Sequence, residues 1–339
     1  MSGAREQIAQ AVSAIEVLSP TRFAWLGQPS EELPKHVERG MAPADARGYL
    51  VYALEGWLYG DFYVSGGVRT GGHDPDGDDG RGDPQLIASL SAANAGAGCW
   101  EPGWSYRGRD GEELLVERGG LTLRALPQQC RGVPPDGGDD GAAVELLLPS
   151  ELLRSSPGFY MALAPEPLDD RRPTVRLYWN IDLSGAVPFV AAATRIAHRR
   201  RLPARLKVGN HRARFVRCDA AVLYVERDAL LREPDVVAEL YTALTDHLAE
   251  PVPALTRALA PGVGLAEDPG DGQSFGQHRC RLIADGLVDA HERGLGSLEE
   301  RVAAVHERFA AAGLDVDAPH LNPDTESDYS IRIPDARPA

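Results

Sequence analysis

The sequence predicts an α+β fold in which a mixed or antiparallel sheet is flanked by helices. Short apolar segments bounded by Pro, Gly or Asp, as is typical of strands, follow one another after Gly141. Helices are expected between and around them, where apolar residues recur at helical spacing and capping residues precede them. Because these strands and helices do not alternate regularly, the pattern disfavours a doubly wound parallel sheet.

The first 140 residues, 1–140, predict a mainly helical lobe that is a candidate for binding a peptide or a partner. Arg5–Leu18 carries apolar residues at helical spacing, and Pro20 closes it. Pro43 suits the first turn of a second helix, which continues to Phe62. Its aromatic stripe indicates core packing, with a peptide-binding groove as the alternative. A third helix is expected over 84–95, and short strands over 114–116 and 121–126.

Residues 141–320 predict the main domain, and residues 321–339 a Pro-rich tail. The strands of this domain are expected over 144–148, 159–163, 175–181, 204–208 and 220–226. Its helices are expected over 184–200, 228–249, 275–293 and 297–312. Two stretches rich in Gly and Asp, 65–83 and 131–141, predict solvated loops.

The composition is that of a globular protein with an acidic surface. The 339 residues include 35 basic and 50 acidic ones, a net charge of -15. This charge disfavours nucleic acid and anionic membranes as partners, because both repel an acidic surface. No apolar run approaches the ~18 residues of a membrane span, and the amino terminus lacks the pattern of a secretory signal, so we expect a cytoplasmic protein. The four cysteines lie far apart and offer neither a zinc site nor a disulfide framework, so no metal site is expected.

Lysine is scarce in this chain. Lys35 and Lys207 are its only lysines, and every other basic residue is arginine. Arginine keeps its proton in proteins, whereas a desolvated lysine can become a neutral amine base. In the strand RLKV, Lys207 points away from the apolar face, and the chain then returns in a hairpin-like way. Which of Arg212, Arg214 and Arg217 comes beside the lysine depends on a register that the sequence leaves open, and a solvated strand face is the alternative.

A second candidate site lies in the segment GDGQSFGQHRCRLIADGL. Ser274 followed three residues later by Gln277 matches a capping box, so a helix should begin near Phe275. The free backbone amides at the start of such a helix suit an anion.

Basic side chains gather in the first two turns of this expected helix. His278, Arg279 and Arg281 oppose the helix dipole there, which is explained if an anion binds nearby. Arg279 flanks the apolar face of the helix and needs a partner. The alternative to an anion is a core carboxylate such as Glu267 or Asp268.

Three strings carry a resemblance to a known family. They are RLYWNI (176–181), RLKVGN (205–210) with the following RCDAAVLYV, and PGVGLAEDPGDGQSFGQHRCRLIADGL (261–287). They resemble the HopA-type family, which is named for a type III secreted effector and is also found beside peptide-modifying enzymes in gene clusters. The resemblance covers about the last half of the chain, and its last string is long and specific.

The resemblance implies a lyase. In class V lanthipeptide and thioamitide biosynthesis, HopA-like members are phosphoserine/phosphothreonine lyases that follow a separate Ser/Thr peptide kinase. The kinase phosphorylates a ribosomal precursor peptide, and the lyase eliminates phosphate to give dehydroalanine or dehydrobutyrine. Such members resemble phosphothreonine lyases, including in the architecture expected of the C-terminal half, and these use no metal. The resemblance therefore implies no cofactor, a phosphorylated precursor peptide and a kinase as partners, and a cyclase as a further candidate.

Elimination of phosphate requires a base for the Cα proton, cations for the leaving group and an acid for the departing oxygen. Lys207 is the candidate base, provided that burial and nearby arginines lower its pKa. His278 or Tyr178 is the candidate acid, with His278 slightly favoured. Phosphothreonine lyases carry Lys-x-His in an early strand, where this sequence has Arg176 and Tyr178.

The phosphate clamp is expected from Arg217, Arg279 and Arg281, because guanidinium groups bind phosphate in bidentate fashion. Ser274 and Asn210 are further candidate phosphate contacts. The alternative function is a noncatalytic effector-like or scaffold protein that binds a peptide or a pathway partner.

Overall fold

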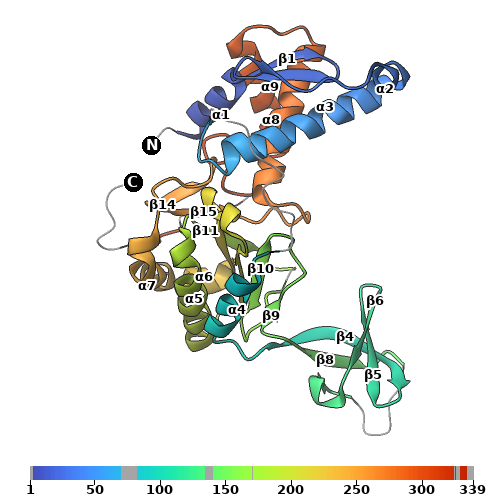
Figure 1. Ribbon diagram of the computed structural model, residues 1–339, viewed down its shortest axis with the longest axis vertical. Helices are drawn as coiled ribbons and strands as arrows, with labels where there is room; N and C mark the ends of the chain where they lie inside the picture. Colours follow the sequence, from blue (N-terminus) through green and yellow to red (C-terminus); the bar gives the residue numbers. More distant parts are fainter. Residues whose placement is uncertain are drawn as a thin grey trace.

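A seven-stranded sheet forms the centre of the computed structural model, which describes residues 3–69, 82–133, 140–169, 171–323, 325 and 329–333 (Figure 1). The strand order is β14-β15-β11-β13-β12-β10-β9, and every neighbouring pair is antiparallel. Helices lie on both sides of the sheet, so the predicted α+β class is confirmed. The strands are β9 (Glu151–Leu152), β10 (Phe159–Leu163), β11 (Thr174–Trp179), β12 (Ala204–Gly209), β13 (Ala221–Glu226), β14 (Arg257–Ala260) and β15 (Val263–Glu267).

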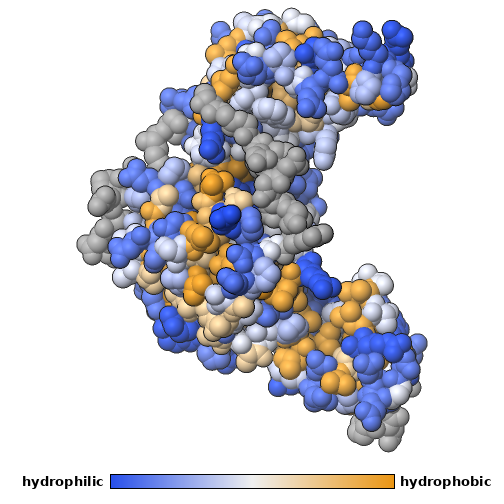
Figure 2. Space-filling model, in the orientation of Figure 1, coloured by the Kyte–Doolittle hydropathy of each residue, from blue (hydrophilic) through white to orange (hydrophobic). Residues whose placement is uncertain are grey.

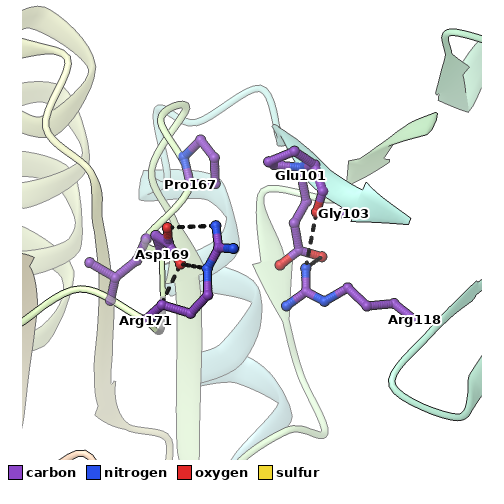
Figure 3. A pocket seen from close by; sticks show the side chains of 8 residues that line it. Glu101, Gly103, Arg118, Pro167, Asp169 and Arg171 are labelled. Carbon is purple, nitrogen blue, oxygen red and sulfur yellow. Dashed lines mark hydrogen bonds and ion pairs between the residues drawn. The ribbon is translucent and has the colours of Figure 1, made fainter. Parts of the chain in front are cut away.

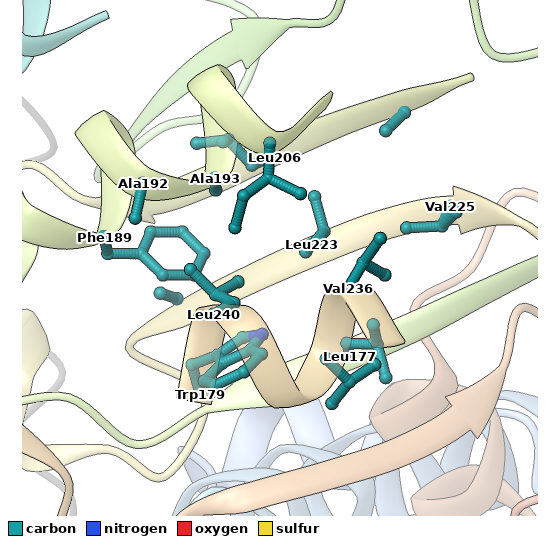
Figure 4. Packing of buried hydrophobic residues seen from close by; sticks show 14 of the residues in the cluster. Leu177, Trp179, Phe189, Ala192, Ala193, Leu206, Leu223, Val225, Val236 and Leu240 are labelled. Carbon is teal, nitrogen blue, oxygen red and sulfur yellow. The ribbon is translucent and has the colours of Figure 1, made fainter. Parts of the chain in front are cut away.

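One face of this sheet is apolar and packs against a layer of helices. Leu177, Leu206 and Leu223 come from three neighbouring strands and meet Phe189 and Leu240 of the helices (Figure 4). Because side chains alternate along a strand, the residues between these apolar ones point to the opposite face. The helices of the layer are α4 (Pro84–Ala93), α5 (Ala186–Arg200), α6 (Arg227–Arg232) and α7 (Asp235–Leu244).

The opposite face meets a helical cap that is built from both ends of the chain. α8 (Phe275–Glu292) packs between α3 (Pro43–Leu58) and α9 (Leu298–Ala311), and α1 (Ala4–Ser13) packs on α9. α3 continues into the π-helical turn η1 (Tyr59–Tyr63), whose residues reach the sheet. The aromatic stripe of this segment therefore belongs to the core, as predicted.

Residues 99–148 form a second sheet that projects away from the helical cap (Figure 1). Its order is β6-β5-β4-β8-β7, and it has a small core of its own around Trp104, Val116 and Leu146. The surface is hollowed between this projecting sheet and the helical cap (Figure 2). The predicted division of the chain at residue 140 stays a prediction. The strands are β4 (Cys99–Asp110), β5 (Glu113–Arg118), β6 (Leu121–Ala125), β7 (Cys130–Arg131) and β8 (Ala143–Leu148).

Two predicted helices are wrong in part. The helix expected over 5–18 ends at Ser13, and Ile15–Ser19 is a strand, β1, because pairing with β2 (Arg22–Trp25) overrides the local helical spacing. A third short strand, β3 (Gln28–Pro29), completes this hairpin sheet. The helix expected over 228–249 is divided into α6 and α7 at Pro234, which lacks the N–H of a helix interior.

The expected loops lie partly outside the described residues, which omit 70–81 and 134–139. The same holds for the tail, of which 324, 326–328 and 334–339 are omitted. In the ranges that the structure describes, we find no helix with the length and apolar character needed to span a bilayer.

Candidate active site

Two rows of side chains cross the face of the central sheet that meets the helical cap. In the first row, Tyr178 of β11 and Lys207 of β12 are both paired with Val222 of β13, which lies between them. In the second row, Arg176 and Arg205 lie in the same way on either side of Tyr224. Two strand spacings separate the outer members of a row, about 10 Å between backbones. Lys207 and Tyr178 therefore lie on the same face of the sheet, with Val222 between them.

Lys207 is held at this face by an aromatic ring and a carboxylate. Its Nζ lies 4.5 Å from the centroid of the Phe159 ring on β10. Burial lowers the pKa of Lys207, but the attraction of Tyr224, Tyr59 and Asp219 outweighs burial, and the pKa is raised above its usual value. The expected lowering is therefore wrong, and at neutral pH the side chain is an ammonium.

The return of the chain brings two of the three candidate arginines to this site: Arg214, whose guanidinium carbon lies 5.4 Å from the centroid of the same Phe159 ring, and Arg217. Its Nε and Nη2 donate to the two carboxylate oxygens of Asp219 at 2.7 and 2.9 Å, and Nη2 also donates to the Tyr59 hydroxyl at 3.0 Å. Both members of the ion pair are buried. Burial alone would raise the pKa of Asp219, but Arg217 holds it below its usual value.

Tyr178 has a buried hydroxyl on the same face. Burial raises the pKa of this hydroxyl, and a hydrogen-bonding interaction with Tyr63 opposes the rise. The ring of Tyr63 from η1 packs against it edge to face, with 6.4 Å between centroids. Gly276 of α8 makes room for that ring, because a Cβ there would lie 2.2 Å from Cε1 of Tyr63.

The start of α8 is built as the sequence predicts. The Ser274 Oγ accepts a hydrogen bond from the Gln277 N–H at 3.2 Å, and the Gln277 Oε1 accepts one from the Ser274 N–H at 3.2 Å. The capping box is therefore confirmed, and Phe275 is the first helical residue.

Arg279 is turned towards the C-terminal segment and away from Lys207. It is 1% exposed, and its Nε and Nη2 donate to the backbone carbonyls of Pro319 and Leu321 at 2.8 and 3.0 Å. Its Nη1 lies 2.7 Å from Nδ1 of His278, and burial lowers the pKa of the arginine to about 10. Backbone carbonyls therefore take the place of the core carboxylate that was the alternative partner of Arg279.

The other basic residues of α8 also lie outside the two rows. Arg281 is exposed and pairs with Asp285 at 3.1 Å and with Glu55 of α3 at 3.4 Å. His278 accepts from Arg279 through Nδ1, while its Nε2 lies 4.0 Å from Asp271. Burial lowers the pKa of His278. The structure thus brings together Lys207, Tyr178 and Arg217. The start of α8 meets the same sheet face at Gly276, which packs on Tyr63, and at the Gln273 carbonyl, which accepts a hydrogen bond from Arg176.

Asn210 connects elements at the end of β12. Its N–H donates to the Gly158 carbonyl at 3.1 Å, and its carbonyl accepts from the Asp83 N–H at 2.7 Å. Its side chain is buried, and its Oδ1 has no hydrogen-bond partner among the described residues. Asn210 is thus placed to fix the backbone that follows Lys207.

A cleft of about 740 Å³ lies beside the second row. Arg176 and Arg205 form part of its wall, together with the Gly-rich segment that follows Asp268. A smaller cavity of about 400 Å³ lies where the projecting sheet meets the loop before β11 (Figure 3). Its charges are already paired, Glu101 with Arg118 and Asp169 with Arg171, at 3.0 and 2.9 Å. In the ranges described, no group of His, Cys, Asp or Glu is placed to hold a metal ion.

Several residues on this sheet face were not predicted as site residues from the sequence. Arg205 and Tyr224 occupy the same strand faces as Lys207 and Val222, so strand alternation was a usable signal for them. Tyr59, Tyr63 and Asp219 had no such signal, because η1 and β13 meet only in the folded chain.

Comparison with known proteins shows the family to which this chain belongs. The HopA1 effector protein family matches residues 150–321, just over half of the chain. The chain belongs to this family. The HopA1 match runs from β9 to beyond α9, so it includes both rows of the sheet face and the start of α8.

Two solved structures of effectors are similar to the chain. One is the effector protein from Pseudomonas syringae pv. tomato strain DC3000, at 16% identity and a TM-score of 0.49, covering 94% of this chain and 96% of that one. The other is from Pseudomonas syringae pv. syringae strain 61, at 14% identity and a TM-score of 0.44, covering 81% and 98%. No match is found among curated proteins. Membership of the HopA1 family therefore rests on the match over 150–321.

Proposed function

We propose that the chain is a lyase that eliminates phosphate from phosphoserine or phosphothreonine of a ribosomal precursor peptide, giving dehydroalanine or dehydrobutyrine. A separate Ser/Thr peptide kinase would supply the substrate in the cytoplasm, and a cyclase would use the product. The observation that supports this proposal is the shared sheet face of Lys207 and Tyr178, with Val222 between them and guanidinium groups nearby.

Each step of the reaction has a candidate group at this face. Lys207 takes the Cα proton in its neutral form, which is a minor fraction at neutral pH because its pKa is raised, and the electrons of the Cα–H bond form the Cα–Cβ double bond. The Cβ–O bond breaks, and the phosphate leaves with its electron pair. Tyr178 gives its proton to the departing oxygen. Tyr178 replaces His278 as the favoured acid, because the His278 ring is engaged by Arg279.

Arg217 and Arg176 are better candidates for the phosphate clamp than the arginines of α8. Arg217 belongs to the buried cluster with Asp219, and Arg176 is near enough to Lys207 to lower the pKa of the amine. Arg217 and Arg176 also donate to the carboxylates of Asp219 and Asp268, whereas Arg279 donates to the C-terminal segment and Arg281 pairs with Asp285. Removing one such donor typically costs 10² to 10³ in rate, so two would supply a large part of the catalysis.

The experiment is a single incubation with a synthetic peptide that contains one phosphothreonine. We expect loss of phosphoric acid by mass spectrometry and capture of the new double bond by an added thiol. Tyr178→Phe should bind the peptide but lose most of the turnover, by about 10² or more. An intact phosphopeptide after incubation with the kinase partner present would contradict the proposal.

The raised pKa of Lys207 favours a second candidate, a noncatalytic effector-like or scaffold protein that binds a phosphorylated peptide. An ammonium that stays charged binds phosphate well but cannot take a proton. In that case Lys207→Met would weaken binding of the phosphopeptide, and wild-type protein would leave the peptide unchanged.

A further inference from the structure

The chain after α9 is attached to the last residue of β15. The Glu267 N–H donates to the His320 carbonyl at 2.8 Å. The Glu267 carboxylate is buried and accepts hydrogen bonds from three groups of this later segment, the Asn322 N–H at 2.8 Å, Thr325 Oγ1 at 2.9 Å and the Tyr329 hydroxyl at 2.6 Å. A buried carboxylate requires such donors, so Glu267 holds the C-terminal segment against the sheet.

Asn322 connects this attachment to Asp268, the residue that follows Glu267. The Asn322 Nδ2 donates to the Asp268 carbonyl at 2.7 Å, and the Asp268 N–H donates to the Thr174 carbonyl at 2.8 Å. The backbone of Asp268 is therefore held on one side by the C-terminal segment and on the other by the start of β11.

Asp268 in turn holds the guanidinium group of Arg176. The Arg176 Nε donates to the Asp268 carboxylate at 2.7 Å, and its Nη2 donates to the carbonyl of Gln273 in the same loop at 3.0 Å. Arg176 and Asn322 both form part of the wall of the 740 Å³ cleft, so a ligand in the cleft can reach this guanidinium. An arginine that is already held in place loses less conformational freedom when it binds an anion.

We propose that Glu267 and Asn322 are positioning residues, which hold Asp268 and, through it, keep Arg176 in place to bind phosphate. This inference rests on the proposed function for the role of Arg176. Neither Glu267 nor Asn322 touches the phosphate. Attachment of the C-terminal segment and binding of phosphate then favour each other, because coupling between two sites is reciprocal.

The test compares two substitutions that each remove one buried hydroxyl. Tyr329→Phe removes a donor to Glu267, while Tyr160→Phe removes a donor to Glu151, at 2.6 and 2.7 Å. Both tyrosines are 0% exposed, and three strands separate β10, which carries Tyr160, from β15. The two variants should therefore lose stability to a similar extent in thermal denaturation. Only Tyr329→Phe should affect Arg176.

The nuclear magnetic resonance signal of the Arg176 Nε–H is the readout, and Arg176→Gln assigns it. Without any ligand, Tyr329→Phe should speed exchange of this hydrogen with water by about fivefold. Titration with inorganic phosphate, followed by the same signal, should show binding weakened by about the same factor. Tyr160→Phe should match the wild type in both measurements.

Asn322→Ala is a second variant that leaves the buried core intact. It removes the Nδ2 donor to Asp268 but keeps the N–H that donates to Glu267, and it should reproduce both effects on Arg176. Wild-type exchange in both Tyr329→Phe and Asn322→Ala would overturn the proposal, as would faster exchange with unchanged phosphate affinity. If both effects are found while no phosphopeptide is eliminated, the positioning role stands and the lyase function fails. Elimination with a wild-type KM in both variants would be the reverse result.

Discussion

Replacing Arg279 by methionine separates a structural role of this arginine from a role in phosphate binding. Methionine keeps an apolar stem of similar reach but has no donors. The substitution removes two charge-assisted hydrogen bonds to the carbonyls of Pro319 and Leu321, at 2.8 and 3.0 Å. Each is worth about 1.5–3 kcal/mol, and the carbonyls left behind lie at buried Pro319 and half-buried Leu321. We therefore expect Arg279→Met to lower the free energy of unfolding by about 3–5 kcal/mol.

Urea denaturation followed by circular dichroism measures this loss. Arg281→Met is the matched comparison on the same helix, because Arg281 is exposed and makes surface ion pairs that are worth under about 1 kcal/mol. The phosphopeptide affinity of the folded fraction should change little in Arg279→Met. A variant that is as stable as wild type but binds the phosphopeptide much more weakly would refute the reasoning and return Arg279 to the phosphate clamp.

Three further predictions follow from the contacts of single residues. Because the pKa of Lys207 is raised, the rate of elimination should increase about tenfold per pH unit and still be increasing near pH 10, whereas a plateau near pH 7 would contradict a lysine base. Gly276→Ala should displace the Tyr63 ring, lower the free energy of unfolding by about 1–3 kcal/mol in thermal denaturation, and reduce activity. Gly56→Ala is the control, because a Cβ there meets nothing within 4 Å, and it should not lower stability or activity. Burial lowers the pKa of His320 to about 4, so between pH 6.5 and 4 the folded state binds fewer protons than the unfolded state. The free energy of unfolding should therefore decrease by about 1–2 kcal/mol as the pH falls from 6.5 to 4. His320→Gln should remove that pH dependence, and an unchanged pH profile would show that His320 is not its source.

The sequence predicted best those features that are encoded locally. Ser274 and Gln277 encode the capping box of α8, and both of its hydrogen bonds are present in the structure. The strand that carries Lys207 is bounded by Pro203 and Gly209, and it spans Ala204–Gly209. In each case one short segment contains all the information that its structure requires.

Features that depend on distant partners were not predictable in the same way. The helical spacing of α8 correctly placed Arg279 near the buried face, but its partners lie 40 and 42 residues further along in a segment without periodicity. β4 was missed because Pro102 and Gly103 interrupt its pattern, where the register with β8 also shifts. The pKa of Lys207 depends on Asp219 and Tyr59, and the latter reaches the sheet only through the turn η1.

The most direct test of the central claim is the release of inorganic phosphate from a phosphothreonine peptide by two lysine variants. Lys207→Met removes the amine that faces Tyr178, while Lys35→Met removes the only other lysine, which lies on the exposed helix α2 (Lys35–Gly40). We predict that Lys207→Met slows release by about 10² to 10⁴ and that Lys35→Met releases phosphate at the wild-type rate. Equal rates for the two variants would contradict the assignment of Lys207 as the base.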